Sequence, residues 1–119
     1  MKRTFALAAL ILCLVAPSAF AQSAKVPSPR HFKVLFENSE VRVLRANVNA
    51  NDKTEPHELR DAVVVPLTNY EVKHVGANGK VTDVRRVAGH PVWVPGGKRV
   101  AEIGNRPAEA IVVEIKNKK

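Results

Sequence analysis

Residues that could bind a ligand or a metal ion gather near the middle of the sequence. If residues 57–61 are extended, His57, Leu59 and Asp61 point the same way, because side chains alternate between the two faces of a strand. Glu58 has the opposite parity and is expected to face solvent. A histidine and a carboxylate are metal ligands, but a leucine separates them, and a site needs three or four donors.

A further histidine occurs in the alternating segment 70–75, where Tyr70 and His74 share the apolar face. This parity makes His74 either a third metal ligand beside His57 and Asp61 or a core histidine with a hydrogen-bonding partner. By the same reasoning, His57 is either a ligand or a solitary histidine with a partner of its own.

Lys98 and Trp93 suggest a different kind of site. A lysine directed into a cavity favours an anionic ligand and repels a metal cation, whereas after the Gly96-Gly97 turn it could simply be solvated. Trp93 either stacks on a ligand or packs against a partner subunit. The candidate ligand-binding residues are therefore His57, Lys98, Trp93 and Tyr70, and the candidate metal ligands are His57, Asp61 and His74.

Short apolar segments separated by turn residues must position these side chains, and none has a sustained helical period. Asn78-Gly79 predicts a hairpin. Pro66 is expected at a sheet edge or a bulge, because proline cannot donate to the ladder. About eight strands and no helix predict an all-β, jelly-roll double sheet. The expected strands cover residues 32–36, 40–48, 62–67, 70–75, 80–87, 92–94, 99–103 and 110–115.

The first 21 residues have the pattern of a secretory signal peptide. A basic start is followed by an apolar run over residues 5–16 and by Ala19-Phe20-Ala21, which predicts cleavage after Ala21 and a periplasmic or secreted protein. The run is shorter than the roughly 20 residues of a membrane span, so no membrane span is expected. The only cysteine, Cys13, leaves with this peptide, so the mature chain is expected to form no disulfide.

The remaining chain has the length of one small domain. Residues 22–31 are polar, contain two prolines and predict a leader in which His31 is solvated, residues 32–116 predict the barrel, and residues 117–119 form a basic tail. The net charge is +8, but the cations are dispersed and aromatics are few, so no nucleic-acid partner is expected. Solubility or weak attraction to anionic envelope surfaces accounts for the charge.

With these segments placed, residues 32–115 resemble a small single-domain member of the cupin superfamily. Pro56-His57 and the strand after it resemble the first cupin motif, residues 89–97 resemble the second, and residues 37–44 are similar to the opening strand of such proteins. The resemblance implies a cupin-type double-stranded β-helix, a jelly-roll barrel with a site in its mouth.

The motifs depart from the family pattern at the metal ligands. The second histidine of the first motif is replaced by Leu59, and the acid, as Asp61, comes early. In the second motif His90 stands where the aspartate is expected, and the position of the third histidine falls on Lys98 or Val100. At most two of the four implied ligands remain, so the metal-binding motif is degenerate.

We therefore expect an exported cupin-fold protein without a metal cofactor that binds a small polar or anionic molecule in the barrel mouth or serves as an assembly module. The alternative is a metal-dependent enzyme of the dioxygenase or isomerase type, in which His57, Asp61 and His74 bind a divalent ion such as Fe, Mn, Ni or Zn. A third interpretation is an envelope interaction module that uses the basic tail. A homodimer paired through sheet edges is expected, since so small a domain gains core by pairing.

Overall fold

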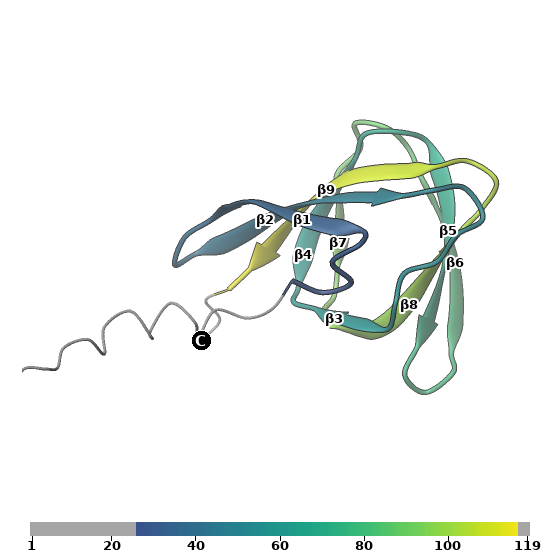
Figure 1. Cartoon of the computed structure of the whole chain (residues 1–119), viewed down its shortest axis with the longest axis horizontal. Helices are drawn as coiled ribbons and strands as arrows, with labels where there is room; N and C mark the ends of the chain where they lie inside the picture. Colours follow the sequence, from purple (N-terminus) through teal and green to yellow (C-terminus); the bar gives the residue numbers. More distant parts are fainter. Residues whose placement is uncertain (1–25, 117–119) are drawn as a thin grey trace, which may run out of the picture.

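The computed structural model describes residues 26–116, which form two antiparallel β-sheets facing each other (Figure 1). The predicted signal peptide and the tail at 117–119 lie outside the described residues. In the described part there is no helix, and so none that is long and apolar enough to cross a membrane. The strands are β1 (Phe32–Glu37), β2 (Val41–Val48), β3 (His57–Leu59), β4 (Ala62–Pro66), β5 (Tyr70–Gly76), β6 (Val81–Arg86), β7 (Val92–Val94), β8 (Gly97–Ile103) and β9 (Ala108–Ile115).

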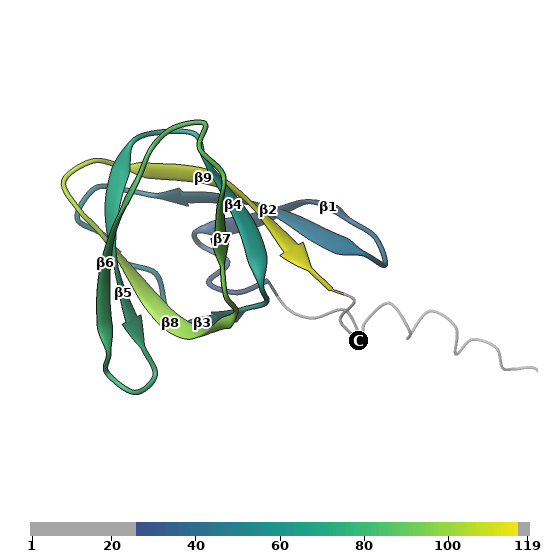
Figure 2. The same ribbon diagram turned by 180° about the vertical axis from the view of Figure 1, so that it is seen from behind.

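The two sheets are wound together. One has the strand order β1-β2-β9-β4-β7 and the other the order β3-β8-β5-β6. From β3 onward each strand lies in the opposite sheet from the one before it, apart from the β5–β6 hairpin, so the chain passes repeatedly from sheet to sheet (Figures 1 and 2). This winding confirms the predicted all-β jelly-roll barrel.

Alternation along the strands fills the space between the sheets. In β9 every second residue from Ala108 to Glu114 is buried, and the residues between them are half-buried on the outer face. Burying a Leu or Val side chain contributes roughly 1.5–3 kcal/mol. The interior is therefore the main source of stability, as expected without disulfides. The interior has two apolar clusters of buried residues. One contains Phe32, Leu44, Ala62 and Val112. The other contains Val48, Tyr70, Val72, Ile103 and Ala108.

Two irregularities interrupt the sheet with five strands. The register of β1 against β2 shifts between Val34 and Phe36, which is a β-bulge. Pro66 lies in β4, between β9 and β7, yet β7 pairs with β4 only as far as Val64. Because β7 has ended, the side of Pro66 away from β9 needs no ladder donor, and its carbonyl accepts a hydrogen bond from the Gly89 amide at 2.8 Å.

The segment before β1 differs from the predicted leader. Ser28 and His31 are buried, at 4% and 5% exposure, so the prediction of a solvated His31 is wrong. Ser28 has a φ of 45°, and this turn folds the segment back so that its hydroxyl lies 2.9 Å from His31 Nδ1. His31 Nε2 lies 3.5 Å from the Asp52 carboxylate. These contacts hold residues 28–31 against the barrel.

Candidate functional site

A partly open cavity of about 80 Å³ lies between the two sheets. Inward-facing side chains of both sheets form its wall, and most of them are apolar. The polar side chains in the wall come mainly from the sheet that contains β3, β8, β5 and β6. They are Thr54, His57, Tyr70, His74, Arg86 and Arg99.

A wider hollow of about 680 Å³, which we call the vestibule, lies between the β5–β6 hairpin and the turn from β7 to β8. Its lining includes four cationic side chains, and Trp93, which is 58% exposed, lies on its rim. No aspartate or glutamate occurs among the described residues that line the vestibule or the cavity. The four cations are Lys80, Arg86, Lys98 and Arg99.

The vestibule and the cavity share four residues of the described chain, which we call the neck. These residues come from β5, β6, β7 and β8, so both sheets contribute to the neck. A molecule that entered the cavity from the vestibule would pass them. They are His74, Arg86, Val94 and Arg99.

The pairing of β3 with β8 decides which cation faces inward. His57 is directly opposite Arg99, and Glu58 is directly opposite Lys98. Residues opposite each other in an antiparallel pair share a face, so His57 and Arg99 line the cavity together. Lys98 is exposed and lines only the vestibule. Arg99 therefore occupies the inward position where the resemblance to the second cupin motif predicted Lys98 or Val100 in place of the third histidine.

Arg99 is held at the neck by the turn before it. Its Nη2 donates a hydrogen bond to the Pro95 carbonyl oxygen at 2.6 Å. Burial lowers the pKa of its guanidinium from the usual value, but an arginine keeps its proton in proteins. No ion pair joins Arg99 to a carboxylate within residues 26–116. The charge is therefore available to a ligand.

Arg86 is anchored by Tyr70. The two residues are directly opposite each other in the β5–β6 hairpin, and the guanidinium is hydrogen-bonded to the phenol. Burial raises the pKa of Tyr70, so the phenol stays protonated at neutral pH. Tyr70 thus lines the cavity and also fixes the second cation of the neck.

The two inward histidines are neutral at pH 7. Burial, and after it the nearby charges of Arg99 and Arg86, lower the pKa of His74 to about 4. Burial also lowers the pKa of His57. His57 Nδ1 lies 2.8 Å from the Glu55 carbonyl oxygen, a contact that places the ring proton on Nδ1.

His74 Nδ1 has no such contact. It is buried and makes no hydrogen bond to any other described residue. Leaving a buried polar atom unpaired costs about 1–3 kcal/mol, so such atoms usually mark a bound water or ligand. Because His74 belongs to the neck, this nitrogen is available to a molecule held there.

Asp61 does not join the histidines. Strand β3 ends at Leu59 and the chain crosses to the other sheet, so the alternation that predicted a shared face stops. The Asp61 carboxylate instead accepts a hydrogen bond from the Gly96 amide at 2.7 Å.

The residues at the neck do not fit a divalent metal. In the described part of the chain no group of three or more His, Cys, Asp or Glu side chains is placed to hold an ion. His74 at the neck and His57 in the cavity wall are two donors where a site needs at least three, and the guanidinium charges of Arg86 and Arg99 oppose a cation.

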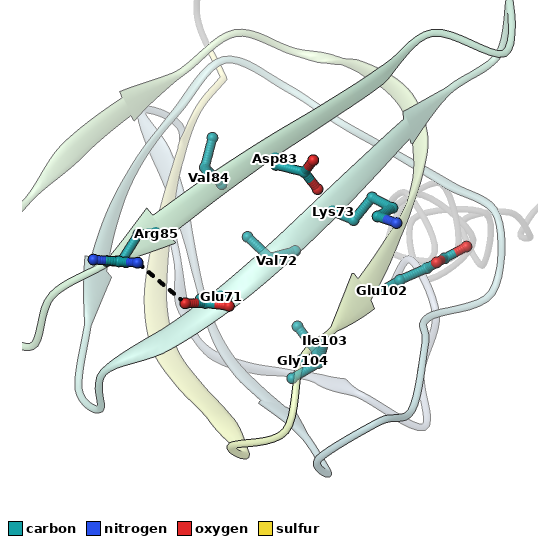
Figure 3. A pocket seen from close by; sticks show the side chains of 9 residues that line it. All are labelled: Glu71, Val72, Lys73, Asp83, Val84, Arg85, Glu102, Ile103 and Gly104. Atoms are coloured by element: carbon teal, nitrogen blue, oxygen red, sulfur yellow. Dashed lines mark hydrogen bonds and ion pairs between the residues drawn. The ribbon is translucent and has the colours of Figure 1, made fainter.

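A third hollow, of about 650 Å³, lies on the outer face of the sheet that contains β5 and β6, away from the cavity (Figure 3). Charges alternate across this face, with Lys73 opposite both Asp83 and Glu102. Glu71 and Arg85 form an exposed ion pair at 3.4 Å. Surface pairs of this kind contribute less than about 1 kcal/mol. We interpret this face as a solvated surface.

The two sheets, the way the chain winds between them and the cavity that they enclose are those of a cupin fold, and comparison with solved structures confirms this fold. No protein-family model and no curated protein matches the sequence. A cupin domain from Bordetella pertussis is 22% identical, with a TM-score of 0.64 over 72% of this chain and 92% of that one.

Two further structures illustrate the range of proteins with this fold. A conserved protein with a double-stranded β-helix domain from Klebsiella pneumoniae is 19% identical, with a TM-score of 0.56 over 82% of this chain and 84% of that one. The polyketide cyclase RemF from Streptomyces resistomycificus is 17% identical, with a TM-score of 0.53 over 72% of this chain and 64% of that one. Likeness at these identities shows the fold, and the function has to be argued from the site.

Proposed function

We propose that this protein is exported and binds a small anion at the neck of its barrel. One observation carries the proposal: Arg86 and Arg99 stand together at the neck, and no described residue lining the vestibule or the cavity carries an opposing carboxylate. Two cationic charges in a partly buried site without an opposing carboxylate are costly unless a ligand compensates them. A carboxylate or a similar oxyanion matches the planar donors of a guanidinium.

The other residues of the site assist this binding in different ways. Lys80 and Lys98 line the vestibule, where like charges around a hollow raise the local concentration of anions. His74 Nδ1 offers an unpaired polar atom at the neck. Trp93 lies on the rim but on the outer face of β7, opposite Val63, so we assign it no contact with the anion.

The test is a titration with acetate and with inorganic phosphate, followed by amide chemical shifts in the NMR spectrum of the exported protein. We expect shifts at the neck and a 10- to 100-fold weaker affinity in Arg99→Gln, because a hydrogen bond to a charged group contributes about 1.5–3 kcal/mol. Arg85→Gln is the matched control, since Arg85 lies beside Arg86 on the outer face of β6. Equal affinity in the Arg99 and Arg85 variants would refute the proposal.

A further inference from the structure

The cavity behind the neck is mostly apolar although its entrance is cationic. Branched aliphatic side chains and alanines of both sheets form most of its inner wall, beside Phe32, Thr54, His57 and Tyr70. A second charge placed there would lose its hydration without gaining a partner. A dianion that placed its second charge inside the cavity should therefore bind more weakly than a monoanion. The aliphatic lining of the cavity includes Val48, Val64, Val72, Ile103 and Val112.

The volume of the cavity limits what can fill it. An apolar protein cavity of about 150 Å³ holds benzene, which has six carbon atoms. The cavity of about 80 Å³ is roughly half that size, so it has room for about three or four carbon atoms. Each methylene that leaves water for such a wall improves affinity about fourfold.

We infer that the anion is a short-chain aliphatic monocarboxylate. Its carboxylate lies between Arg86 and Arg99, with His74 Nδ1 beside it, and its tail of three or four carbons fills the cavity. Butyrate and valerate have tails of this length. The inference rests on the proposed anion binding and adds the class of ligand.

A chain-length series tests the inference. The probes are acetate, propionate, butyrate, valerate, hexanoate and octanoate, each titrated into the exported protein by NMR. We expect affinity to rise about fourfold per carbon as far as butyrate or valerate and then to fall. Equal affinity along the series, with acetate binding still lost in Arg99→Gln, would overturn the inference and leave the proposed function standing. Binding of no anion at all would overturn both.

Variants that fill the cavity give a second, independent test. Ala101 lines the cavity and lies directly opposite His74 in the β5–β8 pair, so a larger side chain there takes the space of the tail. We expect Ala101→Leu to lose the preference for butyrate over acetate. Ala101→Val, which adds less volume, should give an intermediate result if the leucine variant fails to fold. An unchanged preference in a folded variant would overturn the inference.

A separate observation concerns the outer face of the other sheet, where an unbroken apolar row crosses all five strands. The register places Phe36 opposite Val43, Val43 opposite Val113, Val113 opposite Val63, and Val63 opposite Trp93. Phe36 and Trp93, at the two ends, are 54% and 58% exposed. The β-bulge after Val34 contributes, because strict alternation would have turned Phe36 inward.

The geometry points to a second copy of this chain as the occupant of this row. Phe36 and Trp93 lie on the two edge strands, β1 and β7, with β9 midway between them. A twofold axis parallel to β9 would place Phe36 of each copy against Trp93 of the other, which makes the row complementary to itself. The five strands have 6, 8, 8, 5 and 3 residues, so at about 3.3 Å per residue and about 4.8 Å between strands they cover roughly 480 Å² in each copy, or about 950 Å² in total, the size of a weak, transient dimer interface.

Sedimentation velocity of the exported protein tests this second inference. We expect a dimer at about 50 μM that becomes monomeric in Phe36→Glu and in Trp93→Glu, both exposed positions where a charge leaves the core intact. Val81→Glu is the control, because Val81 is 51% exposed on β6 of the other sheet. A monomeric wild type, or a dimer that only Val81→Glu disrupts, would overturn the inference.

Discussion

Acid should destabilise this protein through His74 before it acts on the carboxylates. The pKa of His74 is about 4 in the folded barrel, against 6.5 in an unfolded chain. Between these values the unfolded state binds the proton more readily. The contribution of neutral His74 to the free energy of unfolding is therefore fully present above pH 6.5 and is lost as the pH falls toward 4.

The expected loss follows from the two pKa values. Between pH 7.5 and pH 4.5 the linkage relation gives about 2.5 kcal/mol for this one residue. A domain of about 100 residues loses roughly 4–8 °C of Tm per kcal/mol, so His74 alone should lower the Tm by about 10–20 °C. The pKa of His57 is also lowered, but His57 stays in place in the variant and does not contribute to the difference.

The assay is urea denaturation followed by circular dichroism at both pH values, on the wild type, His74→Gln and His90→Gln. Glutamine keeps a polar side chain at the neck but removes the titration, and His90 is an exposed turn residue. We expect the wild type and His90→Gln to lose about 2.5 kcal/mol more than His74→Gln on acidification. If the free-energy difference between the wild type and His74→Gln is the same at both pH values, the assigned burial of His74 is wrong.

Three further predictions concern the metal, a buried ion pair and a turn. Metal analysis by plasma mass spectrometry should find far less than one equivalent of Fe, Mn, Ni or Zn, with the same content in His57→Ala; a stoichiometric metal lost in that variant would contradict the donor set described here. Glu114→Ala should lower the free energy of unfolding by about 3–5 kcal/mol in chemical denaturation, because it removes the fully buried carboxylate that accepts a hydrogen bond from Arg42 Nε at 2.6 Å. A decrease below about 1 kcal/mol would contradict this prediction. Gly96→Ala should lower the Tm, since a Cβ there would lie 2.8 Å from the Asp61 amide nitrogen; an unchanged Tm would show that the turn yields easily.

Much of the fold could be predicted because alternation and turn residues act locally. Asn78-Gly79 fixed the β5–β6 hairpin, and every predicted strand occurs with its ends moved by two residues or fewer. The packed segment at residues 28–31 was missed, because its contacts are with Asn47, Asp52 and Glu55, which are distant in the sequence and close only after folding.

The site was harder to predict because it depends on pairings between distant strands. Parity alone places His74 and Tyr70 inward. The hairpin register could also have shown that Arg86 lies opposite Tyr70. Arg99, by contrast, faces the cavity because β8 pairs with His57 across a gap of about forty residues, and no local pattern gives that register. Asp61 does not share a face with His57, because strand β3, which would have aligned the two side chains, ends at Leu59.

The edges of the two sheets limit how these molecules can aggregate. Of the four edge strands, β3 and β7 have three residues each and β1 is interrupted by its bulge, which leaves β6, with six residues, as the regular edge. Short or irregular edges are poor templates for the addition of another strand. Association through the apolar row would end with two copies, whereas a regular open edge would allow further strands to be added. Within the described part of the chain, strand addition between copies would therefore be confined to β6.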